Sequence, residues 1–146
     1  MRGATYADSS FLVSLHSDDA NAGAARRFMA RHPVELPFSP LHRLEVFNGL
    51  RLSVFRGEMT REERAAVLSQ IEEDLADGLL FHQPMPWTDA MRQAEKLSAA
   101  HAELIGSRSA DILHVAAAML ANVRCFLSFD KRQRDLARAA GLEVKP

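Results

Sequence analysis

Four acidic residues stand where solvation alone does not readily explain a carboxylate: Asp8, Glu45, Asp111 and Asp130. Asp8 closes a short strand-like run, and Asp130 follows the most apolar strand-like run of the chain, residues 125–129. Asp111 opens an alanine-rich helical segment, whereas Glu45 interrupts an apolar helical stripe. Carboxylates that converge can hold a divalent cation, which lowers the pKa of a bound water and neutralises a phosphate under in-line attack. We therefore expect phosphodiester hydrolysis at a metal site.

The elements that must position these acids alternate along the chain. Strands are expected at 4–8, 34–38, 79–82, 124–129 and 142–144, and helices at 9–16, around 24–29, from 40 to 55, from 61 to 75, from a cap at Thr88 to 97, from 109 to 122, and from 131 to 140. Strands separated by helices need crossover connections, which favour a parallel sheet. The prediction is an α/β fold, a three-layer sandwich with a mostly parallel central sheet, helices on both faces, and one domain over residues 1–146.

Several of the expected helix ends carry capping signals. Ser39-Pro40 supplies an N-cap followed by proline at the first helical position. Thr60 and Glu63 have the spacing of a capping box, and Gly78 is expected to end the helix that they open.

Position in the fold selects these four acids from the nineteen in the chain. In open parallel sheets, ligands collect at the carboxyl ends of the strands. Asp8 and Asp130 fall at two such ends, and Asp111 falls at a helix N-terminus on the same edge. Glu45 lies within a helical stripe that we expect to face inward, formed by Leu41, Leu44, Asn48, Leu52 and Phe55.

Each acid also has a structural explanation when it is taken alone. Asp8 and Asp130 could be helix N-caps, Asp111 could complement a helix dipole, and Glu45 could form a buried salt bridge. All four together are harder to explain, because two carboxylates about 5 Å apart repel by roughly 3 kcal/mol at an effective dielectric constant of 20. A hard divalent cation would offset that repulsion, and all-oxygen ligation favours Mg²⁺ or Mn²⁺ over zinc.

The composition is that of an ordinary globular protein. Apolar residues make up 47% and charged residues 25% of 146 residues, and no apolar run is long enough to span a bilayer. The N-terminal run is too short for a signal peptide, so we expect a cytoplasmic location. The single Cys125 is interpreted as a small buried hydrophobe, not as a nucleophile. The net charge of −1 does not indicate a polyanion partner, but Lys131, Arg132, Arg134 and Arg138 form a basic cluster after Asp130.

The chain resembles a known family, the PIN-domain ribonucleases, and within it the VapC-type toxins of bacterial toxin–antitoxin pairs. The resemblance covers the whole chain and is strongest over residues 6–12, residues 108–118 and residues 127–130. It implies that Asp8, Glu45, Asp111 and Asp130 are the catalytic, metal-binding acids, that Ser10 and Ser128 support them, and that Mg²⁺ or Mn²⁺ is the cofactor. It also implies cleavage of structured RNA, a homodimer, and a cognate antitoxin whose tail fills the active-site groove.

Other charged residues near these segments are candidates for RNA binding. Arg108, His114, Lys131, Arg132 and Arg134 flank the two late acids and could contact phosphates without reading sequence. A lone helical histidine is more often a structural group, and this alternative stays open for His114. Asp135 could assist Asp130, but its place within a helix favours solvation.

Two other functions compete with the ribonuclease hypothesis. The first is a PIN-like domain that binds RNA or a partner without cutting. The second is a receiver-type phosphoacceptor switch, suggested by Lys131 after a late strand and by acids at strand ends. A receiver needs an acid pair after its first strand, and the adjacent early acids Asp18 and Asp19 fall on a loop.

Overall fold

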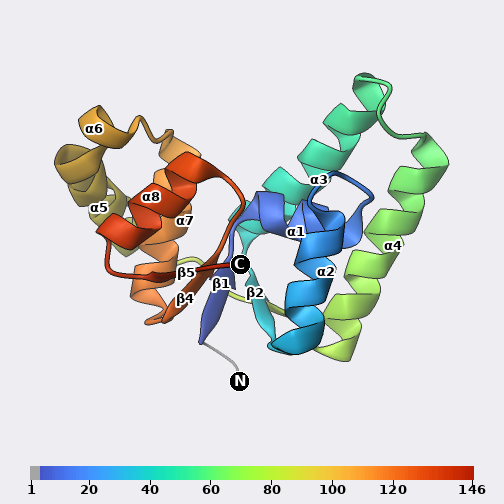
Figure 1. Ribbon diagram of the computed structural model, residues 1–146, viewed down its shortest axis with the longest axis horizontal. Helices are drawn as coiled ribbons and strands as arrows, with labels where there is room; N and C mark the ends of the chain where they lie inside the picture. The colour runs from blue at the N-terminus through green and yellow to red at the C-terminus, as the bar shows by residue number, and fades with distance from the viewer. Residues whose placement is uncertain (1–3) are drawn as a thin grey trace.

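The strands of the molecule are parallel and form two adjacent sheets. The structure, a computed structural model, describes residues 4–146. In the three-stranded sheet the order is β1 (Thr5–Ala7), β4 (Cys125–Leu127) and β5 (Glu143–Lys145). The strands β2 (Leu36–Phe38) and β3 (Leu80–His82) pair with each other, and β2 lies beside β1 in the centre of Figure 1. The mostly parallel sheet that the element order predicts is confirmed. Residues 1–3, part of the N-terminal run considered above, lie outside the described range.

Helices cover the strands on both faces, as the three-layer prediction requires (Figure 1). On one side lie α5 (Trp87–Leu97), α7 (Ser109–Leu120) and α8 (Lys131–Ala139). On the other side lie α1 (Ser9–His16), α2 (Ala22–Arg31), α3 (Pro40–Phe55) and α4 (Arg61–Asp77). None of the helices within residues 4–146 combines the length and the apolar composition that a membrane-spanning helix needs.

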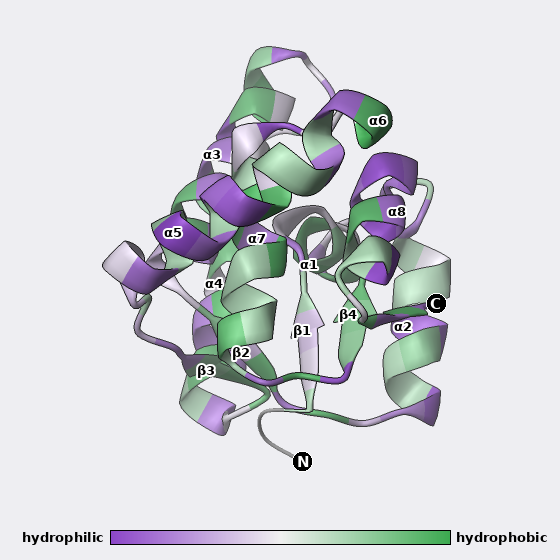
Figure 2. Cartoon of the chain, turned by 90° about the vertical axis from the view of Figure 1, so that its left-hand side faces the viewer, coloured by the Kyte–Doolittle hydropathy of each residue, from purple (hydrophilic) through white to green (hydrophobic). Residues whose placement is uncertain are grey.

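The hydrophobic core is divided between the two faces of the strands. Tyr6 and Phe126 belong to the cluster under α5 and α7, whereas Ala7 and Leu127 belong to the cluster under α1, α3 and α4. This division follows from the two-residue period of a strand, which sends successive side chains to opposite faces. Burial of each large apolar side chain contributes about 1.5–3 kcal/mol. In Figure 2, β4 and α7 are drawn largely in green, the colour of hydrophobic residues, and most of their residues are buried.

The capping signals work as local chemistry predicts at three helix ends. The Ser39 hydroxyl accepts from the backbone N–H of His42, and the His42 ring in turn accepts from the Ser39 N–H. At the start of α4 the Thr60 hydroxyl accepts from the N–H of Glu63. Gly78 ends α4 with a φ of 83°, a left-handed conformation that glycine adopts without a Cβ penalty.

Some predicted boundaries are wrong. Thr88 does not cap α5, because the carbonyl of Pro86 accepts from Ala90 N at 2.8 Å and the helix begins at Trp87. The strand predicted to run to residue 129 ends at Leu127, where its partner β1 also ends. A π-helical turn, η1 (Ser98–Ala102), and the short α6 (Glu103–Ile105) follow α5 and were not predicted.

The inward face of α3 is not the one that the apolar stripe predicted. Leu44, Leu52 and Phe55 are 69%, 39% and 87% exposed, whereas the buried residues of α3 are His42, Val46 and Leu50. Both sets recur at helical spacing, so the periodicity alone could not decide which face the rest of the fold covers. Glu45 lies at the border of the true inward face and is half-buried. The apolar stripe was therefore the wrong reason to select Glu45, and its role in the site stays a prediction.

Candidate active site

Asp8 joins the end of β1 to the start of α1. Its Oδ1 accepts from the Phe11 N–H at 2.8 Å and from the Ser10 hydroxyl at 2.9 Å, so Asp8 is also the N-cap of α1. The side chain is almost fully buried. Burial raises the pKa of this carboxyl, although hydrogen bonds from Ser128 and Phe11 pull it partly back. The structural role considered for Asp8, that of a helix N-cap, is therefore confirmed, and the capping bonds fix the carboxylate in place.

Asp130 holds the equivalent position at the start of α8. Its Oδ1 accepts from the Gln133 N–H at 2.8 Å, which caps the helix. The backbone N–H of Asp130 donates to the hydroxyl of Ser128 at 3.1 Å. Ser128 is fully buried, and the same side chain is hydrogen-bonded to Asp8. Ser128 thus connects the two capping acids, and the structure places Ser10 and Ser128 in contact with them.

Asp111 lies in the first turn of α7 and is half-exposed. Burial raises the pKa of this carboxyl, and the charges of Asp130, Asp8 and Glu45 raise it further against the opposing effect of His114. The four acids chosen from the sequence therefore act on one another electrostatically. Glu45 and Asp111 belong to α3 and α7, and Asp8 and Asp130 precede α1 and α8 as N-caps, so their proximity is a product of the fold.

Glu45 is held by hydrogen-bond donors from two other helices. Ser9 Oγ donates to Glu45 Oε1 at 2.9 Å, and Nε2 of His114 makes a very short contact with the same oxygen. Burial raises the pKa of Glu45, but the hydrogen bond and charge of His114 and the bond from Ser9 outweigh it, so the pKa is lowered. The partner of the half-buried acid is thus the histidine His114.

His114 is a buried structural group. Only 2% of its surface is exposed, which contradicts the suggestion that it contacts substrate phosphate. Its Nδ1 lies 2.7 Å from the Tyr6 hydroxyl, and its Nε2 lies 3.1 Å from Ser9 Oγ. The His42 ring packs 4.9 Å from the His114 ring and bonds through Nε2 to the Ala7 carbonyl at 2.8 Å.

Sequence reasoning missed the roles of Tyr6, Ser9 and His42 in this cluster. One signal was present, because His42 and Glu45 are three residues apart and share a face of α3. Tyr6 and Ser9 could not be connected to His114 without the fold, because more than 100 residues separate them in the chain.

Basic side chains lie beside two of the acids, Asp111 and Asp130. A cavity of about 390 Å³ is lined by Gly106, Arg108, Asp111, Asp130, Lys131 and Arg132. Arg134 donates to the Ser128 carbonyl at 2.7 Å, so it supports the loop before α8. Asp135 does not join the acids: it pairs with Lys131 at 2.8 Å on the outside of α8.

The acid pair of the receiver hypothesis lies elsewhere. Asp19 accepts from Ser14 at 2.8 Å and Asp18 lies 3.4 Å from Arg26, both in the connection between α1 and α2. Neither is among the charges that act on Asp111. The structure therefore offers no support for a receiver-type switch.

The reactivity of Cys125 is low for a nucleophile. It lies partly buried in β4, and burial followed by the charge of Glu143 raises the pKa of its thiol. The thiolate is the nucleophilic form, so this environment disfavours covalent chemistry at Cys125.

The chemistry of the donor set fits a hard divalent cation. In the part of the chain that the structure describes, no three His, Cys, Asp or Glu side chains stand together as a ready set of direct ligands. Magnesium keeps several waters and needs only one or two direct carboxylates, so a looser group of acids suits it. Burial raises the pKa of Asp111 most, and the repulsion from Asp130, Asp8 and Glu45 raises it further; a cation would relieve that repulsion.

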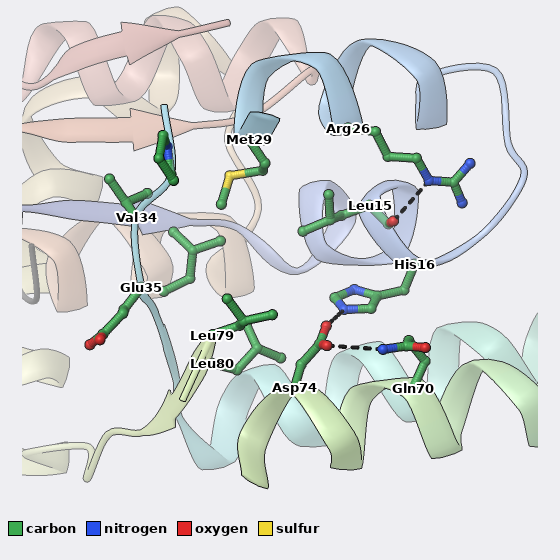
Figure 3. Close-up of a pocket in the computed structure, with 12 residues that line it drawn as sticks. Leu15, His16, Arg26, Met29, Val34, Glu35, Gln70, Asp74, Leu79 and Leu80 are labelled. Carbon is green, nitrogen blue, oxygen red and sulfur yellow. Dashed lines mark hydrogen bonds and ion pairs between the residues drawn. The ribbon is translucent and has the colours of Figure 1, made fainter. Parts of the chain in front are cut away.

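A second cavity, of about 590 Å³, opens between the α1–α2 hairpin and α4 (Figure 3). Its lining is mainly apolar, including Leu15, Met29 and Leu80, but one wall carries a histidine–carboxylate pair. Nε2 of His16 lies 2.6 Å from Asp74, which also accepts from Gln70 at 3.0 Å. None of the four acids lines this cavity.

Comparison with known proteins agrees with this fold. The sequence pattern of the PIN domain family matches residues 5–139. No curated protein sequence matches the chain. The crystal structure of Mycobacterium tuberculosis VapC20, described as a Sarcin-Ricin loop cleaving toxin, superposes with a TM-score of 0.70 at 21% identity, covering 98% of this chain and 100% of that one.

Two further crystal structures have the same fold. FitAcB from Neisseria gonorrhoeae gives a TM-score of 0.65 at 14% identity, covering 97% of this chain and 96% of that one. VapBC2 from Rickettsia felis, bound to a DNA fragment from its promoter, gives 0.64 at 12% identity, with 97% of each chain covered.

Proposed function

The chain belongs to the PIN domain family, and on that basis we propose that it is a Mg²⁺- or Mn²⁺-dependent endoribonuclease, the toxin of a toxin–antitoxin pair held inactive by a cognate antitoxin. The proposal includes a cytoplasmic location and a homodimer. The observation that carries it is the grouping of four carboxylates at one edge of the fold: capping bonds hold Asp8 and Asp130 there, and burial followed by the charges of Asp130, Asp8 and Glu45 raises the pKa of Asp111. Three of the four acids lie at helix N-termini, on the edge where parallel α/β folds bind ligands.

Asp8, Glu45, Asp111 and Asp130 would hold the cation. When bound, a divalent cation supplies a water of lowered pKa and neutralises charge on the phosphate under attack. Asp8 and Asp130 are fixed by their capping bonds, and Glu45 is kept ionised by Ser9 and His114. The half-exposed Asp111 faces the same cavity as the basic side chains.

Arg108, Lys131 and Arg132 line that cavity beside the acids and would bind RNA phosphates. Contacts of this kind position a nucleic acid without reading its sequence. Arg134 would act indirectly, because its guanidinium already binds the Ser128 carbonyl.

The solved structures with the same fold support the toxin assignment. One is described as a toxin that cleaves the Sarcin-Ricin loop, and another is named as a VapBC pair. RNA is therefore the proposed substrate class, and a protein antitoxin is the proposed partner.

Cleavage of total cellular RNA by antitoxin-free protein in Mg²⁺ or Mn²⁺ tests the proposal. We expect discrete fragments that vanish with EDTA and in the Asp8→Asn variant. Asparagine caps a helix as well as aspartate does, so this change removes the charge and keeps the cap of α1. Circular dichroism should show an intact fold.

Asp135→Asn is the matched control, because it removes an acid from the same region that lies outside the cluster. It should cleave as the wild type does. Full activity in Asp8→Asn would overturn the proposal. Tight Mn²⁺ binding with no cleavage of any RNA would point instead to a domain that binds RNA or a partner without cutting.

A further inference from the structure

We propose that His114, together with Ser9 and Tyr6, positions the Glu45 carboxylate at the acidic cluster. The inference rests on the proposed function and adds a positioning residue to it. His114 does not touch substrate, because it is buried, and it acts through the carboxylate that it holds.

Glu45 needs such support because nothing on its own helix fixes it. It lies in the middle of α3, where a glutamate side chain retains three rotatable bonds, and freezing them costs entropy. By contrast, Asp8 and Asp130 are short and are fixed by the helix ends that they cap. Without external donors, Glu45 would be the least ordered of the four acids.

Two donors converge on one oxygen of this carboxylate. Ser9 Oγ and His114 Nε2 both bind Oε1, and no donor among the residues that the structure describes binds Oε2. Since an ionised carboxylate can only accept hydrogen bonds, Nε2 carries the proton that the two groups share. The arrangement leaves one oxygen of Glu45 available to a ligand.

The histidine is itself held from both sides. The Tyr6 hydroxyl lies 2.7 Å from Nδ1, and the rings of Tyr6 and His42 pack within 5.7 Å and 4.9 Å of the imidazole. Tyr6 comes from β1, Ser9 from α1, and His114 from α7. Glu45 is thereby tied to the elements that carry Asp8 and Asp111, which makes its position a property of the whole site.

Two substitutions of His114 distinguish the loss of its hydrogen bond to Glu45 from the loss of its ring. His114→Gln places an amide N–H near the position of Nε2 and keeps a donor to Glu45, whereas the shorter His114→Asn reaches only the position of Nδ1. Loss of a residue that orients a metal ligand typically weakens metal binding by about 10- to 100-fold. We expect His114→Asn to weaken Mn²⁺ binding by about tenfold or more, and His114→Gln to stay within about threefold of the wild type.

The main readout is the affinity of the full chain for Mn²⁺ in the absence of RNA. Electron paramagnetic resonance measures it through the signal of the free ion. Cleavage of RNA and the midpoint of thermal unfolding are measured on the same samples. Equal weakening by the two variants would overturn the proposal, because it would trace the effect to the lost ring and not to the donor.

His16→Asn is the control for a buried histidine that binds an acid elsewhere. Its side chain is 4% exposed, and Nε2 contacts Asp74 at 2.6 Å, so the loss of packing and pairing resembles that in His114→Asn. We expect a lower unfolding midpoint with unchanged Mn²⁺ affinity. If His16→Asn weakened Mn²⁺ binding as much as His114→Asn, a general loss of stability would explain both results.

A double-mutant cycle with Glu45→Gln tests whether His114 acts through Glu45. In that background the substitution His114→Asn should weaken Mn²⁺ binding no further. Independent, additive losses would overturn the inference. Should His114→Asn fail to fold, Ser9→Ala removes the other donor to Glu45, and unchanged Mn²⁺ affinity in that variant would also overturn it.

The wild type and Asp8→Asn separate this inference from the proposed function. A wild type that neither binds Mn²⁺ nor cleaves RNA refutes both. A wild type that binds and cleaves, beside a His114→Asn variant with wild-type affinity, refutes only the role of His114.

Discussion

Two histidine–carboxylate pairs, His114–Glu45 and His16–Asp74, have nearly the same local geometry and very different surroundings. In each pair a buried histidine contacts the acid through Nε2 and satisfies Nδ1 with a second group, the Tyr6 hydroxyl in one case and the Leu12 carbonyl in the other.

The two pairs differ in the groups that surround the acid. Glu45 is one of the three charges that raise the pKa of Asp111, whereas Asp74 accepts from the neutral Gln70 beside an apolar cavity. A buried histidine–acid pair therefore does not by itself mark a site of chemistry. What distinguishes the candidate site is that further acids converge on Glu45.

The largest effect should come from removing one acid in each region. Asp111→Asn should lower RNA cleavage by about 100-fold or more, about 2.7 kcal/mol of transition-state stabilisation, whereas Asp74→Asn should leave cleavage unchanged. Initial cleavage rates at saturating Mg²⁺ measure both. Equal losses in the two variants would erase the functional difference between the regions.

The same two variants should change stability in opposite directions. The raised pKa of Asp111 means that its charge costs folding free energy near neutral pH, so the neutral asparagine should raise the free energy of unfolding without metal. Asp74→Asn weakens a bond to a buried histidine and should lower that free energy by about 1 kcal/mol. Urea unfolding at pH 7 measures both changes.

A third buried histidine, His42, sharpens the comparison, because no acid within residues 4–146 pairs with it. His42 donates to the Ala7 carbonyl and accepts from Ser39 N–H, so it is neutral, and burial followed by the charge of His114 lowers its pKa to about 3.

The stability that neutral His42 contributes is complete above its unfolded pKa near 6.5 and is lost as the pH falls toward about 3. The slope from this residue is about 1.4 kcal/mol per pH unit. His42→Gln cannot titrate and should lack that part of the slope between pH 6 and 4. Identical slopes in variant and wild type would contradict the prediction.

The smallest expected effect is on RNA binding, when one basic residue is removed from each region. Arg132→Ala removes one expected phosphate contact and should weaken RNA binding several-fold, with a salt slope reduced by about one. Arg26 lines the apolar cavity and donates to the Ser17 carbonyl, so Arg26→Ala should leave RNA binding unchanged. Filter binding at several salt concentrations distinguishes the two. An unchanged salt slope for Arg132→Ala would show that it makes no phosphate contact.

Much of the fold could be predicted from local signals. Ser39-Pro40, Thr60 and Gly78 act within a single turn of chain, and each begins or ends a helix where it was expected. The parallel sheet followed from the order of elements alone. Besides some element boundaries, the prediction that failed was the inward face of α3, because helical phase offers two apolar faces and only tertiary contacts choose one.

The candidate site likewise has a part that could be predicted from the sequence and a part that could not. Asp8, Asp111 and Asp130 could be selected because strand ends and helix starts meet at one edge of a parallel sheet. The burial of His114 could not be predicted, since it depends on Tyr6 and Ser9 at the other end of the chain. Whether these acids bind a metal stays a prediction.

Asp8 and Asp130 both cap a helix and belong to the acidic cluster, and this combination affects how the protein could change in evolution. Each carboxylate caps a helix, and asparagine caps a helix equally well. One nucleotide change converts an aspartate codon into an asparagine codon, so a single mutation can remove charge from the cluster with little cost to folding. The product would be a folded copy that keeps every other surface of the active form and competes with it for the same partners.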